Sequence, residues 1–200
     1  IEDDDDPETQ YDGRALPALK AQDRNDRVIY LSSLSKLLSP GLCIGYIVAP
    51  TPVIEQLRQL QRLMIRQIPG NNQVAAALFI QQGHYDRLLQ QARERLGQRA
   101  ALITQALRDY LPQADFIVPT GGATLWLRLP QCHDLTQLYM EGLAKGVLFD
   151  PCTAFYLDPA DCVANPSMRL GFGSIAMDAI VPGIEVLSRV IKAHGLRWNR

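Results

Sequence analysis

The stretch "VIYLSSLSKLLSPGLCIGYIVAP", residues 28–50, decides the fold. Its two apolar runs, residues 28–31 and 44–48, are short and rich in β-branched side chains, which is typical of strands buried on both faces. Between the runs lies a polar loop that contains Lys36. Open α/β sheets bind their ligands where the chain leaves the carboxyl end of a parallel strand, and Lys36 follows such a predicted strand. The stretch therefore predicts an α/β fold with a site at this loop.

Lys36 is a candidate nucleophile. A lysine amine that is desolvated, or that lies near another cation, loses its proton near neutral pH and attacks carbonyl carbons. The other interpretation is a solvated loop lysine, because the string Ser-x-Ser-Lys is short and common. The position of Lys36 favours chemistry, but the string alone does not decide between the two.

Helix and strand patterns alternate along the rest of the chain. From Pro52, apolar residues recur at helical spacing until Pro69-Gly70 ends the pattern. Further helices are predicted over about residues 73–82, 86–111, 135–144 and 177–194, and strands around residues 116–118, 125–129, 147–149 and 168–172. The shorter elements that follow the long helix predict a small α+β lobe, with a boundary inside that helix near residue 95.

Composition limits the classes of function. With 20 basic and 21 acidic residues and a net charge of −1, the chain has no basic surface for DNA or for an anionic membrane. Its four cysteines, Cys43, Cys132, Cys152 and Cys162, form no C-x-x-C pair and no dense disulfide framework, which suits a reducing compartment. No stretch approaches the roughly 20 apolar residues that span a bilayer. We therefore expect a cytoplasmic protein without membrane contact.

The remaining candidate motifs are weak. His84, His133 and His194 have no metal-ligand spacing with one another, and Gly121-Gly122 does not open a dinucleotide-binding helix. We expect no metal site. The opening residues, "IEDDDDPE", lack a methionine and run straight into carboxylates, so we expect a fragment of a longer protein.

Five segments carry a resemblance to a known family. "LSSLSKLLSPGLCIGYIVAP" resembles the lysine segment of class I and II aminotransferases, the fold-type I pyridoxal-phosphate enzymes, most closely as found in MocR-type regulators of the GntR family. "IEDDDDPETQYDGRALPAL" is similar to the acidic opening of that region, and "GHYDRLLQQARERLGQRAALITQAL" to the long interdomain helix. "PTGGATLWLRLP" and "MRLGFGSI" are similar to the carboxyl lobe. The resemblance extends over essentially the whole chain.

The resemblance implies a partial fold of the type I transferases that depend on pyridoxal phosphate (PLP). It would contain the end of the large-domain sheet, the long interdomain helix and a small α+β C-terminal lobe. Residues 1–95 would be the C-terminal part of the PLP-binding large domain, including the lysine loop. Residues 96–200 would be the small C-terminal aminotransferase lobe.

The resemblance also implies roles for single residues. Lys36 would hold PLP through its amine and then move a proton between substrate and cofactor. Asp3 would pair with the pyridine nitrogen, and Ser33 and Ser35 would lie near the cofactor phosphate. Arg169 would bind the α-carboxylate of the substrate with its planar fork. The ligand would be an amino-acid or amine effector. From residue type alone, Asp3 equally suits a solvated acid, the serines suit turn caps, and Arg169 suits a surface position on a strand.

Two positions depart from the family pattern. Asp5 stands where the family has a tyrosine that binds the ring oxygen of the cofactor, and Cys43 stands where it has an arginine on the phosphate. A charge-assisted hydrogen bond contributes roughly 1.5–3 kcal/mol, so Cys43 alone predicts cofactor affinity weaker by about 10- to 100-fold. We therefore expect a partly degenerate or specialised cofactor site.

Two functional classes are compatible with these residues. The first is a ligand-sensing MocR/GntR-type transcription regulator, a homodimer that contacts DNA only through an upstream module absent from this sequence. The alternative is a free-standing PLP-dependent class I aminotransferase that acts on amino acids. If the cofactor site is fully eroded, a third class follows, a dimerisation scaffold without cofactor.

Overall fold

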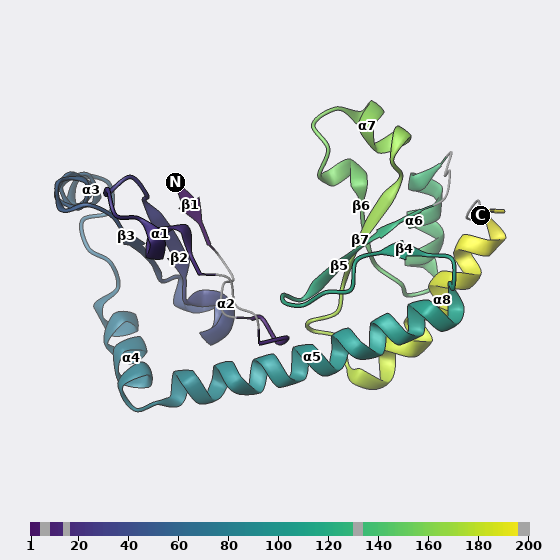
Figure 1. Cartoon of the computed structure of the whole chain (residues 1–200), viewed down its shortest axis with the longest axis horizontal. Helices are drawn as coiled ribbons and strands as arrows, with labels where there is room; N and C mark the ends of the chain where they lie inside the picture. The colour runs from purple at the N-terminus through teal and green to yellow at the C-terminus, as the bar shows by residue number, and fades with distance from the viewer. Residues whose placement is uncertain (5–8, 14–16, 130–133, 196–200) are drawn as a thin grey trace. The chain divides into compact units, whose positions relative to one another are not determined.

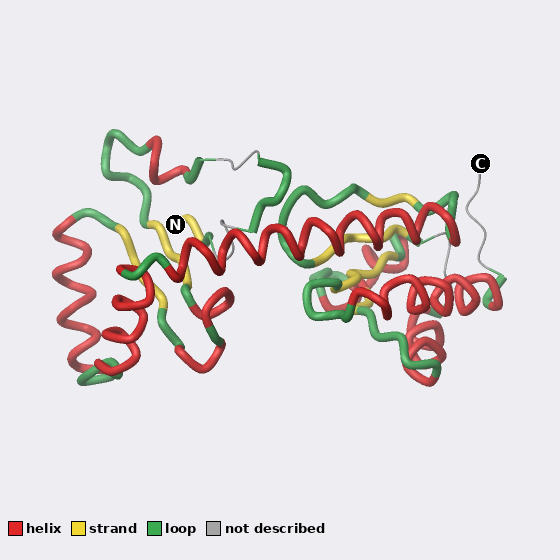
Figure 2. Tube along the Cα trace, turned by 90° about the horizontal axis from the view of Figure 1, so that it is seen from below, coloured by secondary structure: helices red, strands yellow, loops and turns green. Residues whose placement is uncertain are grey.

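The computed structural model describes residues 1–4, 9–13, 17–129 and 134–195. The chain forms two compact units, residues 1–94 and 95–200, and each is described by itself (Figure 1). The helix α5 (His84–Tyr110) is continuous across the boundary and contributes residues to both units (Figure 2). The roles predicted for residues 1–95 and 96–200 stay predictions.

The N-terminal unit contains a three-stranded sheet in the order β1-β2-β3. The strands are β1 (Glu2–Asp3), β2 (Tyr30–Ser33) and β3 (Gly45–Val48). β1 runs parallel to β2, with Asp3 opposite Leu31, and β3 runs antiparallel to β2. Because parallel strands end at the same edge of a sheet, Asp3 and the loop after β2 lie at one edge.

The strand predicted at residues 44–48 is confirmed, but its predicted burial on both faces is wrong. β3 is antiparallel to β2, and Tyr46, Ile47 and Val48 are exposed by 40%, 44% and 45%. The physical reason is that a run of apolar residues indicates which side chains favour burial. It does not indicate whether these 200 residues contain the helices or strands that would cover them.

Short and long helices precede, separate and follow these strands along the chain. They are α1 (Leu19–Gln22), α2 (Ser35–Leu38), the 3₁₀ turn η1 (Pro40–Leu42), α3 (Thr51–Met64) and α4 (Gly70–Gln81). α3 begins one residue before the predicted Pro52, whose fixed φ suits a first turn. The carboxylate of Glu2 accepts hydrogen bonds from the amides of Leu19 and Lys20, at 2.7 and 2.9 Å, and so ties β1 to α1.

Asp23 shapes the entry into β2. Its carboxylate accepts hydrogen bonds from the backbone amides of Val28 (2.9 Å), Arg27 (3.1 Å) and Asn25 (3.1 Å), and from the Lys20 amine at 2.9 Å. The amides of Val28 and Arg27, followed by the Lys20 amine, hold the pKa of this carboxyl well below its usual range. The carboxylate form therefore fixes the turn that leads into Tyr30 at all pH values near neutral.

The C-terminal unit is built on a four-stranded sheet in the order β4-β5-β7-β6. All neighbouring strands in it are antiparallel. The strands are β4 (Asp115–Phe116), β5 (Thr124–Arg128), β6 (Asp150–Pro151) and β7 (Ser167–Gly171). Alternate residues of β5 and β7 are buried and form one apolar face of the sheet: Leu125, Leu127, Met168 and Leu170. The predicted strands near residues 116–118, 125–129 and 168–172 are confirmed to within one or two residues at each end.

Two long helices and part of a third complete the core of this unit. α6 (Leu135–Ala144) and α8 (Met177–Ala193) pack against each other (Figure 1). α5 adds a buried apolar stripe from its second half: Leu96, Ala100, Ile103, Ala106 and Leu107. The helices predicted over residues 135–144 and 177–194 are confirmed to within one residue.

The strand predicted at residues 147–149 is wrong, because β6 begins only at Asp150. Phe149 is buried, and its ring lies edge-on to the ring of Tyr139 at 5.5 Å. A Cβ at Gly142 would meet this ring at 3.2 Å, so α6 approaches Phe149 closely. The apolar pattern at these residues therefore comes from packing on α6 and not from strand pairing.

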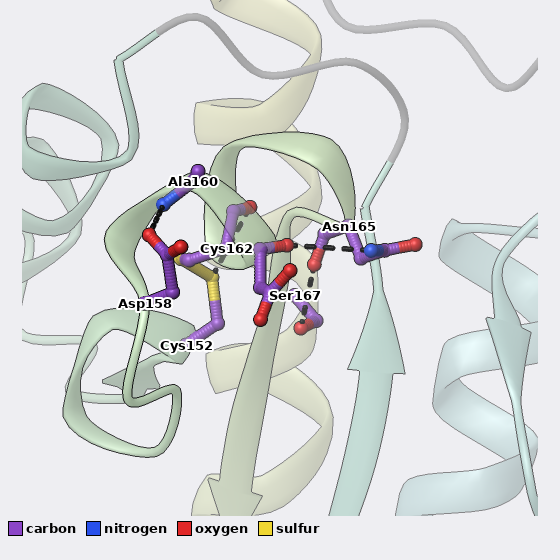
Figure 3. The surroundings of a disulfide bond; sticks show 7 residues. Cys152, Asp158, Ala160, Cys162, Asn165 and Ser167 are labelled. Atoms are coloured by element: carbon purple, nitrogen blue, oxygen red, sulfur yellow. Dashed lines mark hydrogen bonds between the residues drawn. A yellow bond between two sulfur atoms is a disulfide. The ribbon is translucent and has the colours of Figure 1, made fainter.

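A disulfide that the sequence did not predict joins two short elements of this unit (Figure 3). Cys152 lies in the 3₁₀ turn η2 (Cys152–Ala154), and Cys162 lies in α7 (Pro159–Ala164). Both cysteines are buried. Asp158 caps α7 by accepting a hydrogen bond from the Ala160 amide at 2.8 Å. The Cys152–Cys162 disulfide closes a small loop that begins directly after β6.

Candidate functional site

Lys36 lies in α2, directly after the carboxyl end of β2. Its side chain is exposed in this chain. Asp3, also exposed, ends the neighbouring parallel strand β1 and lies opposite Leu31 of β2. The sheet thus brings the predicted amine and the predicted carboxylate to the same edge, which is where open α/β sheets bind ligands.

Ser33 and Ser35 hold the lysine loop closed. The Ser33 hydroxyl donates to the carbonyl of Ile44 at 3.3 Å and accepts from the Ser35 amide at 3.1 Å. The Ser35 hydroxyl accepts from the Ile44 amide at 3.0 Å and lies 3.4 Å from its carbonyl. Both hydroxyls therefore bond to backbone groups and link the segment between β2 and α2 to Ile44, the residue before β3. These bonds are the kind expected if the two serines act as turn caps.

Cys43 is an exposed free thiol at the end of η1. Its backbone has φ +49°, the left-handed region that few residues other than glycine adopt, and its thiol lies 3.4 Å from the Pro40 carbonyl. The side-chain amide of Asn72, near the start of α4, donates to the neighbouring Leu42 carbonyl at 3.2 Å. The thiol offers no positive charge at this position. Asp5, the other departure from the family pattern, lies outside the described residues.

Tyr30 is a buried residue of this site that the sequence patterns did not indicate. Its hydroxyl donates to the Asp4 carboxylate at 3.1 Å, and its ring lies 6.1 Å from the ring of Tyr46. Burial raises the pKa of Tyr30 to about 12, so the hydroxyl keeps its proton and acts as a donor. Its position in the predicted strand of residues 28–31 was the one feature of the sequence that could have indicated it. Tyr46 lies on the neighbouring strand β3.

Arg169 lies on β7, in the C-terminal unit. Its Nε and Nη2 donate to one oxygen of the Asp150 carboxylate, at 2.9 and 2.8 Å, and the guanidinium carbon lies 4.8 Å from the centre of the Phe155 ring. Trp126 lies opposite Arg169 on β5, and its ring is edge-on to Phe155 at 5.4 Å. The sequence motif indicated Arg169 but none of these three neighbours.

The predicted site residues therefore fall into two groups. Asp3, Ser33, Ser35 and Lys36 belong to the N-terminal unit and meet at one sheet edge. Arg169 belongs to the C-terminal unit, with a different set of neighbours. Among the described residues, no group of three or more His, Cys, Asp and Glu side chains could hold a metal ion.

A comparison with known families identifies the chain. The profile of the family described as "Aminotransferase class I and II" matches residues 6–178. The chain belongs to this family. The chain is 35% identical over 192 residues to the HTH-type transcriptional regulator TauR of Rhodobacter capsulatus, a match that covers 96% of the chain and 39% of TauR.

Two solved structures that are similar to the chain carry ligands. The kynurenine aminotransferase of Pyrococcus horikoshii, in complex with PMP, is 30% identical with a TM-score of 0.86, covering 96% of this chain and 47% of that protein. LysN, an α-aminoadipate aminotransferase from Thermus thermophilus, is complexed with N-(5'-phosphopyridoxyl)-L-leucine. It is 27% identical with a TM-score of 0.85, covering 96% of this chain and 50% of LysN.

The chain is therefore a partial α/β fold of the type I aminotransferases, as the resemblance implied. It spans between 39% and 50% of the length of these three proteins. No helix in the described part of the chain is long and apolar enough to cross a membrane.

Membership of the aminotransferase family implies PLP as cofactor, and the described residues fit this group at two of its ends. An exposed lysine amine at a sheet edge suits an aldehyde, and a carboxylate on the adjacent strand suits a pyridine nitrogen. At the phosphate end the fit is weaker. The Ser33 and Ser35 hydroxyls have backbone partners, and Cys43 supplies a thiol.

Proposed function

We propose that this chain is the C-terminal part of the effector domain of a MocR-type regulator of the GntR family. The domain binds PLP at Lys36 and an amino-acid or amine effector at Arg169. The bound effector biases a DNA-binding module that lies upstream in the full-length protein. The similarity to TauR over nearly the whole chain supports the regulator, and the aminotransferase family supports the cofactor.

The observation that carries the proposal is the pairing of β1 with β2. Asp3 and the Lys36 loop lie at the same carboxyl edge of these two strands. This supports a role for the amine toward the cofactor aldehyde and for the carboxylate toward the ring nitrogen. When bound, PLP withdraws electrons from the carbon that carries the amino group of a ligand. The Asp3 carboxylate would pair with the ring nitrogen of a bound cofactor, and the Lys36 amine would accept or return a proton at the ligand carbon.

We further propose that the cofactor site is partly degenerate. Cys43 has no charge with which to bind a phosphate, and its thiol lies beside the Pro40 carbonyl. In place of turnover, weakened binding suits a sensor, because occupancy then responds to cofactor and effector concentrations. We also propose a homodimer in which DNA contact belongs to the upstream module.

A cytoplasmic location belongs to the same proposal, because gene regulators act where the DNA is. The Cys152–Cys162 bond is the observation against it, since disulfides are rare in reducing compartments. A reducing cytoplasm would hold these two residues as a pair of buried thiols. The two states are separated by quenching cells with a denaturant and an alkylating reagent together and counting the alkylated cysteines. Cys152 and Cys162 are alkylated if they are thiols and are not alkylated if they form the disulfide.

A second candidate function is a free-standing aminotransferase that acts on amino acids. The similarity to the Pyrococcus horikoshii kynurenine aminotransferase, at 30% identity and a TM-score of 0.86, favours it. The two candidates differ in turnover. A regulator binds the amino compound without releasing a keto acid at an enzyme's rate, whereas an aminotransferase consumes the amino compound and a keto acid in equal amounts.

The test uses the full-length protein and the absorbance of bound PLP. We expect wild-type protein titrated with PLP to develop a visible band that reduction with borohydride fixes onto the chain, and Lys36→Ala to lose both signals. Lys145→Ala is the matched control, because Lys145 is an exposed lysine at the end of α6. We expect this variant to keep the band.

Two results would contradict the proposal. A band of equal intensity in Lys36→Ala would show that the cofactor binds elsewhere. Keto acid production by the wild-type protein at a median enzyme rate, about 10 per second, would select the aminotransferase.

A further inference from the structure

Asp150 occupies one specific edge of the Arg169 guanidinium. A guanidinium has two edges on which a carboxylate can sit with two hydrogen bonds, the Nε–Nη2 edge and the Nη1–Nη2 edge. Nε and Nη2 both donate to Oδ2 of Asp150, at 2.9 and 2.8 Å. Among the residues that the structure describes, none has a hydrogen bond to Nη1, and Asp150 is the only partner of Nη2. The ion pair therefore leaves one complete carboxylate-binding edge on Arg169.

The sheet fixes this arrangement. Trp126, Arg169 and Asp150 lie directly opposite one another on β5, β7 and β6, so the three side chains form one row across the sheet. The row lies on the face opposite the buried Met168 and Leu170, because neighbouring residues of a strand point to opposite faces. The Arg169 side chain is therefore set by strand register and not by a loop.

Phe155 adds a third constraint. Its ring lies under the guanidinium at 4.8 Å and edge-on to Trp126 at 5.4 Å. An aromatic face and an in-plane carboxylate together determine both the plane of a guanidinium and its rotation within that plane. The segment that carries Phe155 is closed by the Cys152–Cys162 bond.

The ion pair has little value for stability alone. The side chains of Arg169 and Asp150 are 43% and 52% exposed, and water screens pairs this exposed, so they stabilise a fold only slightly. The pair has a larger effect on ligand affinity if it prepares Arg169 for a ligand. A side chain that is already fixed loses little further rotamer freedom when the ligand binds.

We propose that Asp150 is a positioning residue for Arg169. It holds the Nε–Nη2 edge and so directs the Nη1–Nη2 edge to the carboxylate of an α-amino acid. This inference rests on the proposed function, in which Arg169 binds the effector carboxylate. What Asp150 supplies is a hydrogen-bond acceptor. Its negative charge is not needed, because it partly offsets the charge that attracts the ligand.

The test compares two substitutions of Asp150 in the full-length protein. The probe is the standard protein amino acid that binds wild-type protein most tightly in a calorimetric screen. We expect Asp150→Ala, which removes the acceptor, to raise its Kd by about threefold to tenfold. We expect Asp150→Asn, which keeps an acceptor oxygen and removes the charge, to bind at least as tightly as wild type. Rescue by asparagine separates positioning from charge.

Asp115→Ala is the matched control. Asp115 forms a pair with Arg128 at 3.0 Å across β4 and β5 of the same sheet, and both side chains are exposed. We expect this variant to bind the probe like wild type. Equal weakening in Asp115→Ala and Asp150→Ala would overturn the inference, because any exposed ion pair of this sheet would then have the same effect.

Two further outcomes separate this inference from the proposed function. If Arg169→Lys raises the Kd by about tenfold or more while Asp150→Ala binds as tightly as wild type or more tightly, Arg169 is the carboxylate clamp and Asp150 does not position it. If Arg169→Lys leaves the Kd unchanged, Arg169 is not the carboxylate clamp and the proposed function and this inference both fail. If no amino acid binds wild-type protein, this inference fails, and only an amine effector remains for the proposed function.

Discussion

At the scale of single residues, the proposed function predicts that Cys43 weakens cofactor binding. The thiol lies at the surface beside the Lys36 loop, on a backbone with φ +49°, and supplies no charge for a phosphate. We expect Cys43→Arg to lower the Kd for PLP by about 10- to 100-fold, because a charge-assisted hydrogen bond contributes roughly 1.5–3 kcal/mol. The measurement is a titration of full-length protein with PLP, followed by absorbance.

Cys43→Ser is the control for this residue, because it changes the side chain without adding a charge. We expect it to bind PLP like wild type. Equal affinity in Cys43→Arg and Cys43→Ser would contradict the prediction. It would mean that the phosphate lies away from η1 and that the family pattern does not transfer to this loop.

At the scale of elements, the C-terminal sheet depends on a close approach between the end of β7 and the start of β5. The amides of Phe172 and Gly173 donate to the Ala123 carbonyl at 2.8 and 3.2 Å. A Cβ at Gly173 would lie 2.6 Å from the Ala123 Cβ, which is attached to backbone and cannot turn away. We therefore expect Gly173→Ala to lower the free energy of unfolding by about 1–3 kcal/mol in denaturant titrations.

Gly171→Ala is the comparison for this prediction. Gly171 ends β7, and a Cβ there would have no neighbour within 4 Å. Its effect should stay within about 0.5 kcal/mol, as for other open surface positions. Should both variants lose the same stability, the loss would come from the alanine itself and not from contact with Ala123.

Elements also show what could be predicted from the sequence. Long amphipathic helices such as α5 and α8 were predicted to within two residues at each end, because their apolar spacing repeats over several turns. The end of α3 was not, because the helix stops at Met64, before the predicted stop at Pro69-Gly70. The strand predicted at residues 147–149 lies just before the observed β6. Phe149 contributes to the apolar pattern because it packs on α6, not because it pairs in the sheet. The Cys152–Cys162 pair has no spacing signature, and only the fold brings these cysteines together.

The candidate site follows the same division. Lys36 and Arg169 were selected because short motifs around them resemble a family. Tyr30, Asp150 and Phe155 could not be selected in this way, because their roles arise from register across strands and from a loop that folds back. Strand pairing between distant residues is the information that one sequence does not contain.

At the scale of the whole molecule, the N-terminal unit presents apolar side chains that this chain does not cover. A groove of about 420 Å³ lies between β3 and α3, lined by Tyr46, Ile47, Leu57 and Met64 among others. Leu63 and Met64 are exposed by 82% and 79%. Since the chain spans between 39% and 50% of the length of the relatives compared, we expect these side chains to be core residues in the full-length protein.

Leu63→Glu tests this expectation in the full-length protein. A buried leucine contributes about 1.5–3 kcal/mol and a buried unpaired carboxylate costs more, so the free energy of unfolding should fall by about 3 kcal/mol or more. Gln59→Glu, at an exposed polar position of the same helix, should change it by less than about 0.5 kcal/mol. If Leu63→Glu is equally mild, α3 faces solvent in the full-length protein. If it is severe, a midpoint that rises with protein concentration assigns the cover to a second subunit, and a constant midpoint assigns it to the same polypeptide.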